Sequence, residues 1–182
     1  MKRAALSALL LVLSPVAFAA PVAYSAAQGT ATFDHRVRGI NVHGTIAGVT
    51  SSVQLDTGDL AATQGTVTVP LKNLKTGIAM RDSHAMGKEA LNTAQFPTAT
   101  FELDKLTGGK LTEGQTLATT ATGKLTVKGV TKPVTAPVKA TLQDGRVKVS
   151  TQFAFNPHDY GVDYPGSSDR VTVGVNFVLQ SK

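Results

Sequence analysis

The chain has 182 residues and no cysteine, and its 18 lysine and arginine residues against 12 acidic residues give a formal net charge of +6. This length suits one domain behind a short leader, and without cysteine no disulfide framework holds the fold. The basic residues are scattered and tryptophan is absent, whereas a nucleic-acid surface shows a basic stripe interleaved with aromatic residues. Composition therefore argues against a nucleic-acid partner.

The first 19 residues have the three parts of a secretory signal peptide. Lys2 and Arg3 supply the charge, residues 4–13 are an apolar run, and Ala17-Phe18-Ala19 is a small-x-small cleavage site. The apolar run is shorter than the about 20 residues of a membrane-spanning helix. We predict a cleaved signal peptide over residues 1–19, with a retained anchor as the alternative. A periplasmic or secreted domain then covers residues 20–182.

Most of the remaining chain alternates between apolar and polar residues with a period of two, which is typical of half-buried β-strands. Turn signals such as Gln143-Asp144-Gly145 separate the runs, since the favoured hairpin turns need positive φ. Pro133 and Pro137 confine their run to a sheet edge, a bulge or a strand start. The alternating runs are residues 32–37, 49–55, 64–71, 98–103, 124–140, 146–155 and 170–179.

These runs amount to about eight antiparallel strands, and no β-α-β alternation indicates a parallel sheet. The candidates are a sandwich and a closed barrel. A barrel of this size either fills its interior with side chains or holds one ligand. The periodicity leaves that choice open.

A charged segment over residues 77–101 interrupts the alternation. We predict that Asp82 is the N-cap of a short helix over residues 82–91. Arg81 and His84 then lie where a strand gives way to a helix. They either bind an anionic headgroup at a cavity mouth or fasten the insert through a nearby carboxylate and backbone groups.

No catalytic or metal motif stands out. The chain lacks the G-x-S-x-G elbow and any thiol nucleophile. Its histidines, His35, His43, His84 and His158, form neither H-E-x-x-H nor H-x-H, and a metal site usually takes three or four ligands. We predict no metal and no cofactor. His35 shares a strand face with Phe33, so it is either an internal histidine satisfied by a partner or a polar group at the depth of a ligand.

Three blocks together resemble the signature of the YceI-like proteins. They are Arg81-Asp82-Ser83-His84, FPTATF over residues 96–101 and GKLTVKGVTKPV over residues 123–134. Asp159-Tyr160-Gly161 is similar to the D-F-G turn of that family. The resemblance covers essentially all of residues 20–182. It implies an all-β, antiparallel eight-stranded lipocalin-like barrel with a short helical insert, of a periplasmic family whose characterised members hold a polyisoprenoid lipid.

The chain departs from the family pattern at three places. The first strand usually reads F-x-V-x-H, and here His35 and Val37 are exchanged. Ala90-Leu91 stands where many members carry Phe-Phe, and Pro157-His158 stands where an arginine is common. These changes bear on the identity of the ligand more than on the fold.

We therefore predict an exported, non-enzymatic carrier of an isoprenoid or similar long-chain lipid. Apolar burial contributes about 25 cal/mol per Å², so such a ligand needs few polar contacts. The predicted ligand-binding residues are Phe33, His35, Val53, Leu55, Val67, Val69, Arg81, His84, Phe101, Leu103, Leu125, Val127, Phe153, Phe155, Val171, Val173 and Phe177.

Two other classes remain open. One is a structural or stress-response protein whose filled barrel acts through its surface, because the same inward side chains suit a packed core. The other is an enzyme that uses His35 or His84. A transient membrane contact and a homodimer are also left open.

Overall fold

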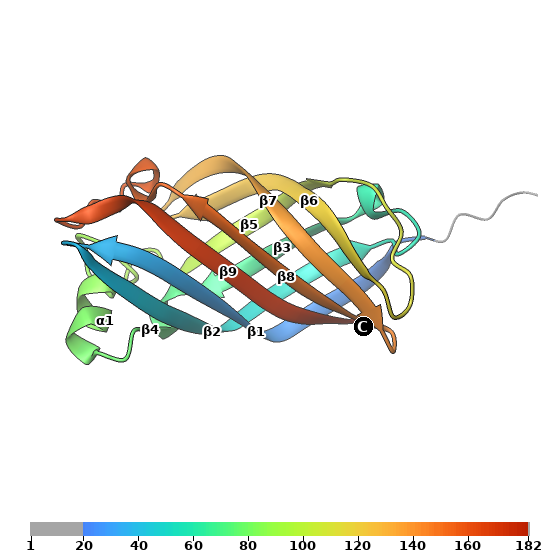
Figure 1. Ribbon diagram of the computed structural model, residues 1–182, viewed down its shortest axis with the longest axis horizontal. Helices are drawn as coiled ribbons and strands as arrows, with labels where there is room; N and C mark the ends of the chain where they lie inside the picture. The colour runs from blue at the N-terminus through green and yellow to red at the C-terminus, as the bar shows by residue number, and fades with distance from the viewer. Residues whose placement is uncertain (1–19, 182) are drawn as a thin grey trace, which may run out of the picture.

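The computed structural model describes residues 20–181, so the predicted signal peptide over residues 1–19 lies outside the described part of the chain (Figure 1). The described chain forms one elongated barrel of long, tilted strands, with a short helix at one end. The strands are β1 (Val22–Val37), β2 (Ile40–Leu55), β3 (Gln64–Pro70), β4 (Leu74–Lys75), β5 (Thr98–Leu106), β6 (Thr116–Val127), β7 (Val130–Gln143), β8 (Arg146–Phe155) and β9 (Ser167–Ser181). The helices are α1 (Ala79–Met86) and the 3-10 turns η1 (Leu60–Ala62), η2 (Leu71–Asn73) and η3 (Pro157–Tyr160).

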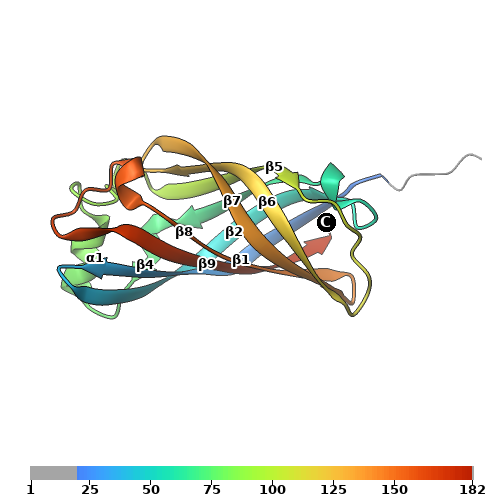
Figure 2. The same ribbon diagram turned by 45° about the horizontal axis from the view of Figure 1, so that its top comes forward.

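The barrel is closed and antiparallel throughout. Its strand order is β1-β9-β8-β7-β6-β5-β3-β2, and pairing of β1 with β2 closes the circle. The two-residue β4 only extends β2, through the pairs Thr45–Lys75 and Ile46–Leu74. Figure 2 shows the strands wrapping around one axis. The prediction of an eight-stranded barrel with a helical insert is confirmed, and the sandwich alternative is wrong.

Period-two alternation separates the inner and outer faces of each strand. In β8, the side chain of Val147 is buried in the interior, while the next residue, Lys148, is exposed. The β8 strand is joined to β7 by Asp144-Gly145, whose φ angles of 51° and 70° are those of the predicted tight hairpin turn. The sequence pattern thus fixes which residues face inward.

Two strands are longer than predicted. β1 begins at Val22 and β2 begins at Ile40, well before the predicted starts near residues 32 and 49. The early inward positions of β1 carry small residues such as Ala26 and Ala31, both buried, whereas the start of β2 carries the bulky inward residues Val42 and Ile46. Small residues bury little apolar area, which weakens the alternating signal in β1.

The two prolines of β7 lie where this strand has one neighbour. β7 pairs with β6 from Val130 to Thr141 but with β8 only from Val138 onward. Pro133 and Pro137 precede Val138, in the part of β7 that has no β8 partner. Proline suits this position because it has no N–H group to donate to a second neighbouring strand. The predicted edge character is therefore confirmed for this half of β7.

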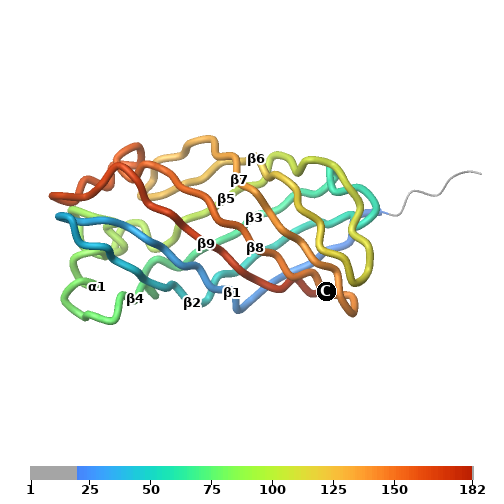
Figure 3. The backbone as a smooth tube through the Cα atoms, in the orientation of Figure 1, coloured from blue at the N-terminus to red at the C-terminus, as the bar shows by residue number. Residues whose placement is uncertain are grey.

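One end of the barrel is plugged by its own loops. Leu60 of η1 and Leu111 of the loop over residues 107–115 are 1% and 3% exposed. Backbone hydrogen bonds of 3.0 Å from Leu60 N to Gly109 O and of 2.8 Å from Leu111 N to Thr57 O fix these loops. The helix α1 lies at the opposite end, as the tube in Figure 3 shows.

Candidate ligand-binding cavity

An apolar cavity of about 570 Å³ runs inside the barrel. Its floor contains the buried Leu60 and Leu111, and its other end reaches the exposed Arg38 and Ile40. Pockets of 300–1,000 Å³ are typical of sites for one small ligand. The barrel is therefore hollow, closed at the η1 end, and open towards α1.

Every residue predicted to bind ligand lines this cavity. Leu55 lies near the floor, Phe101 and Leu125 are paired neighbours on β5 and β6, and Arg81 and His84 lie at the mouth. The full set is Phe33, His35, Val53, Leu55, Val67, Val69, Arg81, His84, Phe101, Leu103, Leu125, Val127, Phe153, Phe155, Val171, Val173 and Phe177. Their position is a fact of the fold, and their contact with a ligand stays a prediction.

Several lining residues were missed because they lie outside the alternating runs. Leu60 and Leu111 form part of the floor, and Arg38 and Tyr164 lie at the mouth. Loop residues carry no periodic signal, so nothing in the sequence marks them as internal. Ala121, also missed, faces inward from β6 with 4% exposure.

His35 is held at the mouth by hydrogen bonds to residues of β9. Its Nδ1 lies 3.0 Å from the carbonyl oxygen of Arg170, and its Nε2 lies 2.6 Å from the Ser167 hydroxyl. A carbonyl only accepts, so Nδ1–H donates to it, and Nε2 accepts from Ser167. These bonds join β1 to β9 where their pairing shifts register. The structure therefore matches the interpretation of His35 as a satisfied internal histidine that still lines the cavity.

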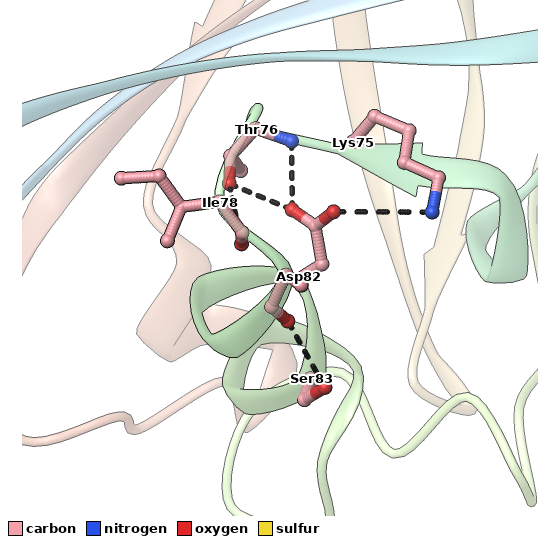
Figure 4. Close-up of polar contacts among 6 residues, drawn as sticks. Lys75, Thr76, Ile78, Asp82 and Ser83 are labelled. Atoms are coloured by element: carbon pink, nitrogen blue, oxygen red, sulfur yellow. Dashed lines mark hydrogen bonds and ion pairs between the residues drawn. The ribbon is translucent and has the colours of Figure 1, made fainter.

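The predicted N-cap is wrong. The helix α1 begins at Ala79, so Asp82 lies in its first turn, and the N-cap residue Ile78 makes no side-chain capping bond. The Asp82 carboxylate instead accepts from the backbone N–H of Thr76 at 2.7 Å and from its hydroxyl at 2.6 Å (Figure 4). Its other oxygen lies 3.9 Å from Lys75 Nζ. Asp82 therefore ties α1 back to the end of β4.

The environment of Asp82 favours its charged form. The hydroxyl of Thr76 is the largest influence and lowers the pKa of Asp82 below the ordinary value of 3.8, while burial acts in the opposite direction. The Thr76 amide, Lys75 and Arg81 add to the lowering. Asp82 is thus a carboxylate at neutral pH, and its anchor to Thr76 is a charge-assisted hydrogen bond.

Arg81 and His84 flank this anchor and differ in their contacts. Within residues 20–181, Arg81 has no carboxylate within salt-bridge distance and no side-chain hydrogen bond, although it is half-buried. The His84 ring stacks on Tyr164 with centroids 6.2 Å apart, and the Tyr164 hydroxyl lies 3.4 Å from His84 Nδ1. This contact joins α1 to the β8–β9 loop at the mouth and does not involve Arg81.

The two other histidines, His43 and His158, do not line the cavity. His43 pairs with Asp34 on the outer face, away from His35. Within the described range, no three histidine or acidic side chains gather closely enough to hold a metal ion. No helix of residues 20–181 is long and apolar enough to cross a membrane.

A second histidine makes the β8–β9 loop sensitive to pH. His158 Nδ1 lies 2.8 Å from Asp163 Oδ1, and this hydrogen bond is the main reason why the pKa of His158 rises above the ordinary 6.5, with burial opposing it. A raised pKa means that the contact stabilises the fold fully below pH 6.5 and is lost as pH rises through the folded value. We expect NMR titration of His158 to show this raised pKa, and Asp163→Asn to lower it towards 6.5. Asp169→Asn, which removes a weaker influence, should change it less; equal effects would contradict the assignment.

A closed barrel around an apolar cavity of this size defines a lipocalin-like barrel. The family model described as the YceI-like domain matches residues 22–179. The chain belongs to the YceI-like family.

Curated relatives match part of the chain. A UPF0312 protein of Enterobacter sp. (strain 638) is 38% identical over 98 residues, which are 54% of this chain and 48% of the relative. A UPF0312 protein of Yersinia pestis (strain Pestoides F) is 36% identical over 102 residues, 56% of this chain and 50% of the relative. The matched region thus spans about half the length of these relatives.

Solved structures share the fold over most of the chain. A polyisoprenoid binding domain from Saccharophagus degradans, implicated in plant cell wall breakdown, superposes with a TM-score of 0.73 at 15% identity, covering 88% of this chain and 99% of that one. BcnA of Burkholderia cenocepacia superposes with a TM-score of 0.71 at 19% identity, covering 82% and 95%. At these identities the likeness shows the architecture alone.

Proposed function

We propose that this protein is a non-enzymatic carrier that holds one isoprenoid-type lipid, with its tail inside the barrel. The observation that carries the proposal is the cavity of about 570 Å³ with an apolar lining and a closed floor. A long hydrocarbon tail gains about 25 cal/mol for each Å² of apolar surface that it buries there. The polyisoprenoid-binding description of one structure with the same fold supports this class of ligand.

The polar end of the ligand is proposed to lie at the mouth. Arg81, His84 and Tyr164 gather there, while the walls are formed mainly by apolar side chains. The Arg81 guanidinium has no carboxylate partner within the described chain, and guanidinium groups suit carboxylate or phosphate oxygens. Tail-first entry leaves the headgroup beside these side chains.

The proposal also places the domain outside the cytoplasmic membrane. Residues 1–19 have the pattern of a secretory signal. A carrier in that compartment would give an apolar lipid a route through water.

A single substitution that fills the cavity tests the proposal. Ala121 faces the cavity and is 4% exposed, so Ala121→Phe places a ring where the tail should lie. We expect decaprenol affinity to fall by at least roughly tenfold, since overpacking costs about 1–3 kcal/mol. Ala118→Phe, on the exposed outer face of the same strand, is the matched control and should bind as the wild type does.

Mass spectrometry of lipid extracted from the exported protein completes the test. A stoichiometric isoprenoid, absent from Ala121→Phe and present in Ala118→Phe, is the expected result. An empty wild-type protein that also refuses added decaprenol would overturn the carrier and favour action through the surface of the barrel.

A further inference from the structure

The exposed apolar side chains of the barrel are concentrated at its mouth. Five large apolar residues are exposed among residues 20–181, and three of them lie at the rim: Ile40 at 65%, Ile78 at 50% and Met80 at 72%. Ile40 begins β2 at the tip of the β1–β2 hairpin, Ile78 is the N-cap of α1, and Met80 lies in its first turn. Figures 1 and 3 show that this hairpin tip and α1 lie at the same end. Exposed apolar side chains gathered at one site mark contact with a partner.

The same rim is positively charged. The two segments over residues 36–42 and 75–84 contain Arg36, Arg38, Lys75 and Arg81, against Asp82 alone. Asp82 is buried and bonded to Thr76 and Lys75, so it offers little charge to the outside. The rim thus combines exposed apolar side chains with an excess of cations.

The charge is distributed unequally along the barrel axis. The loops of the plugged end, over residues 56–63, 107–115 and 144–145, contain four acidic residues and only Lys110 as a basic one. Over all the loops of the mouth end, residues 38–39, 76–97, 128–129 and 156–166, four basic residues balance four acidic ones. An anionic surface therefore repels the plugged end more than the mouth end and attracts the two rim segments locally, which orients the barrel before contact. The acidic residues of the plugged end are Asp56, Asp59, Glu113 and Asp144.

We propose that the rim made by the β1–β2 hairpin and the start of α1 docks on an anionic phospholipid membrane with the cavity mouth facing the lipid. Apolar side chains enter the interface while neighbouring cations contact the headgroups, as in other peripheral membrane proteins. The β8–β9 loop at the same end carries Asp159 and Asp163, and its Gly166 carbonyl accepts a hydrogen bond from Arg38 N at 2.7 Å. We therefore assign the membrane contact to the hairpin tip and the start of α1, and not to this acidic loop. The inference rests on the proposed carrier function for its purpose, since a lipid could then pass between bilayer and cavity without crossing water.

Vesicle binding tests the docking without any cavity ligand. The purified protein should cosediment with vesicles of phosphatidylglycerol and phosphatidylcholine, bind pure phosphatidylcholine at least roughly fivefold less, and dissociate at high salt. The double variant Ile78→Asp/Met80→Asp should bind the anionic vesicles at least roughly tenfold less. Aspartate in the first turn of α1 suits the helix dipole, so the variant should stay folded, as circular dichroism would verify.

Two further variants separate the contributions. Val178→Asp changes an apolar side chain that is 39% exposed on β9, away from the rim, and should bind as the wild type does. Arg36→Gln removes one rim cation that does not line the cavity and should weaken binding roughly fivefold.

Three results would overturn the inference: a wild type that ignores anionic vesicles, a rim variant that binds as well as the wild type, or equal binding to neutral lipid. A rim-to-rim homodimer that the double variant dissociates, without vesicle binding, would also overturn it. Decaprenol binding in solution is a separate readout, since Ile78 and Met80 do not line the cavity. If the wild-type protein does not bind decaprenol, the carrier proposal is wrong, whereas the vesicle-binding result still stands.

Discussion

Val147→Asp should unfold the barrel or lower its free energy of unfolding by about 4 kcal/mol or more. Val147 is 1% exposed, faces the interior of β8, and lies between its paired neighbours Leu142 and Leu179. A carboxylate placed there loses its hydration and gains no cation, which costs several kcal/mol. Whole domains are stable by only about 5–15 kcal/mol, so this cost is a large part of the total. Urea unfolding followed by circular dichroism measures it.

The adjacent residue supplies the control. Lys148 is exposed on the outer face of the same strand, and Lys148→Asp should change the free energy of unfolding by no more than about 0.5 kcal/mol. Equal stability of the two variants would show that the inner and outer faces of β8 have been assigned wrongly.

Asp82→Ala should release α1 from the barrel while the strands stay folded. The carboxylate accepts two hydrogen bonds from Thr76 and faces Lys75, and its removal leaves the end of β4 without that anchor. Charge-assisted hydrogen bonds are among the strongest single contacts. We expect amide hydrogen-exchange protection in α1 to fall at least roughly tenfold, with little change in β6 and β7.

Ser83→Ala is the matched control for this experiment. Ser83 is exposed, and its hydroxyl donates to Ala79 O at 3.0 Å within the helix (Figure 4). Its loss should leave the protection of α1 near the wild-type value. If Asp82→Ala also left α1 protected, the helix would be held mainly by apolar contacts.

The strands were predictable where bulky residues alternate. β8 and β9 place valine or phenylalanine inward at most alternate positions, so the period is clear from the sequence. The early part of β1 buries Ala26 and Ala31, whose small side chains hardly differ from polar neighbours in the pattern. Small inward residues therefore explain the missed start of β1, but not that of β2, where Val42 and Ile46 face the cavity.

The site was predictable only in part. The alternation of apolar and polar residues predicts which strand residues face inward. Leu60 and Leu111 of the floor lie in loops, and only the tertiary fold brings these loops to the interior. An aspartate before a helical segment is typical of an N-cap, which is why the sequence predicts that role for Asp82. In the structure its carboxylate accepts a hydrogen bond from Thr76, which lies outside the helix. Long-range hydrogen bonds such as that of His35 with Ser167 carry no local signal at all.

The plug formed by Leu60 and Leu111 gives the barrel a fixed depth. A chain that enters beside α1 can advance only until it meets these two side chains, which are 1% and 3% exposed. In a carrier of the proposed kind, the distance from mouth to plug would set the longest tail that can be buried completely, and a longer tail would leave its surplus in water. Such a carrier would discriminate between two lipids with the same headgroup by tail length alone, because only the longer tail would reach the plug.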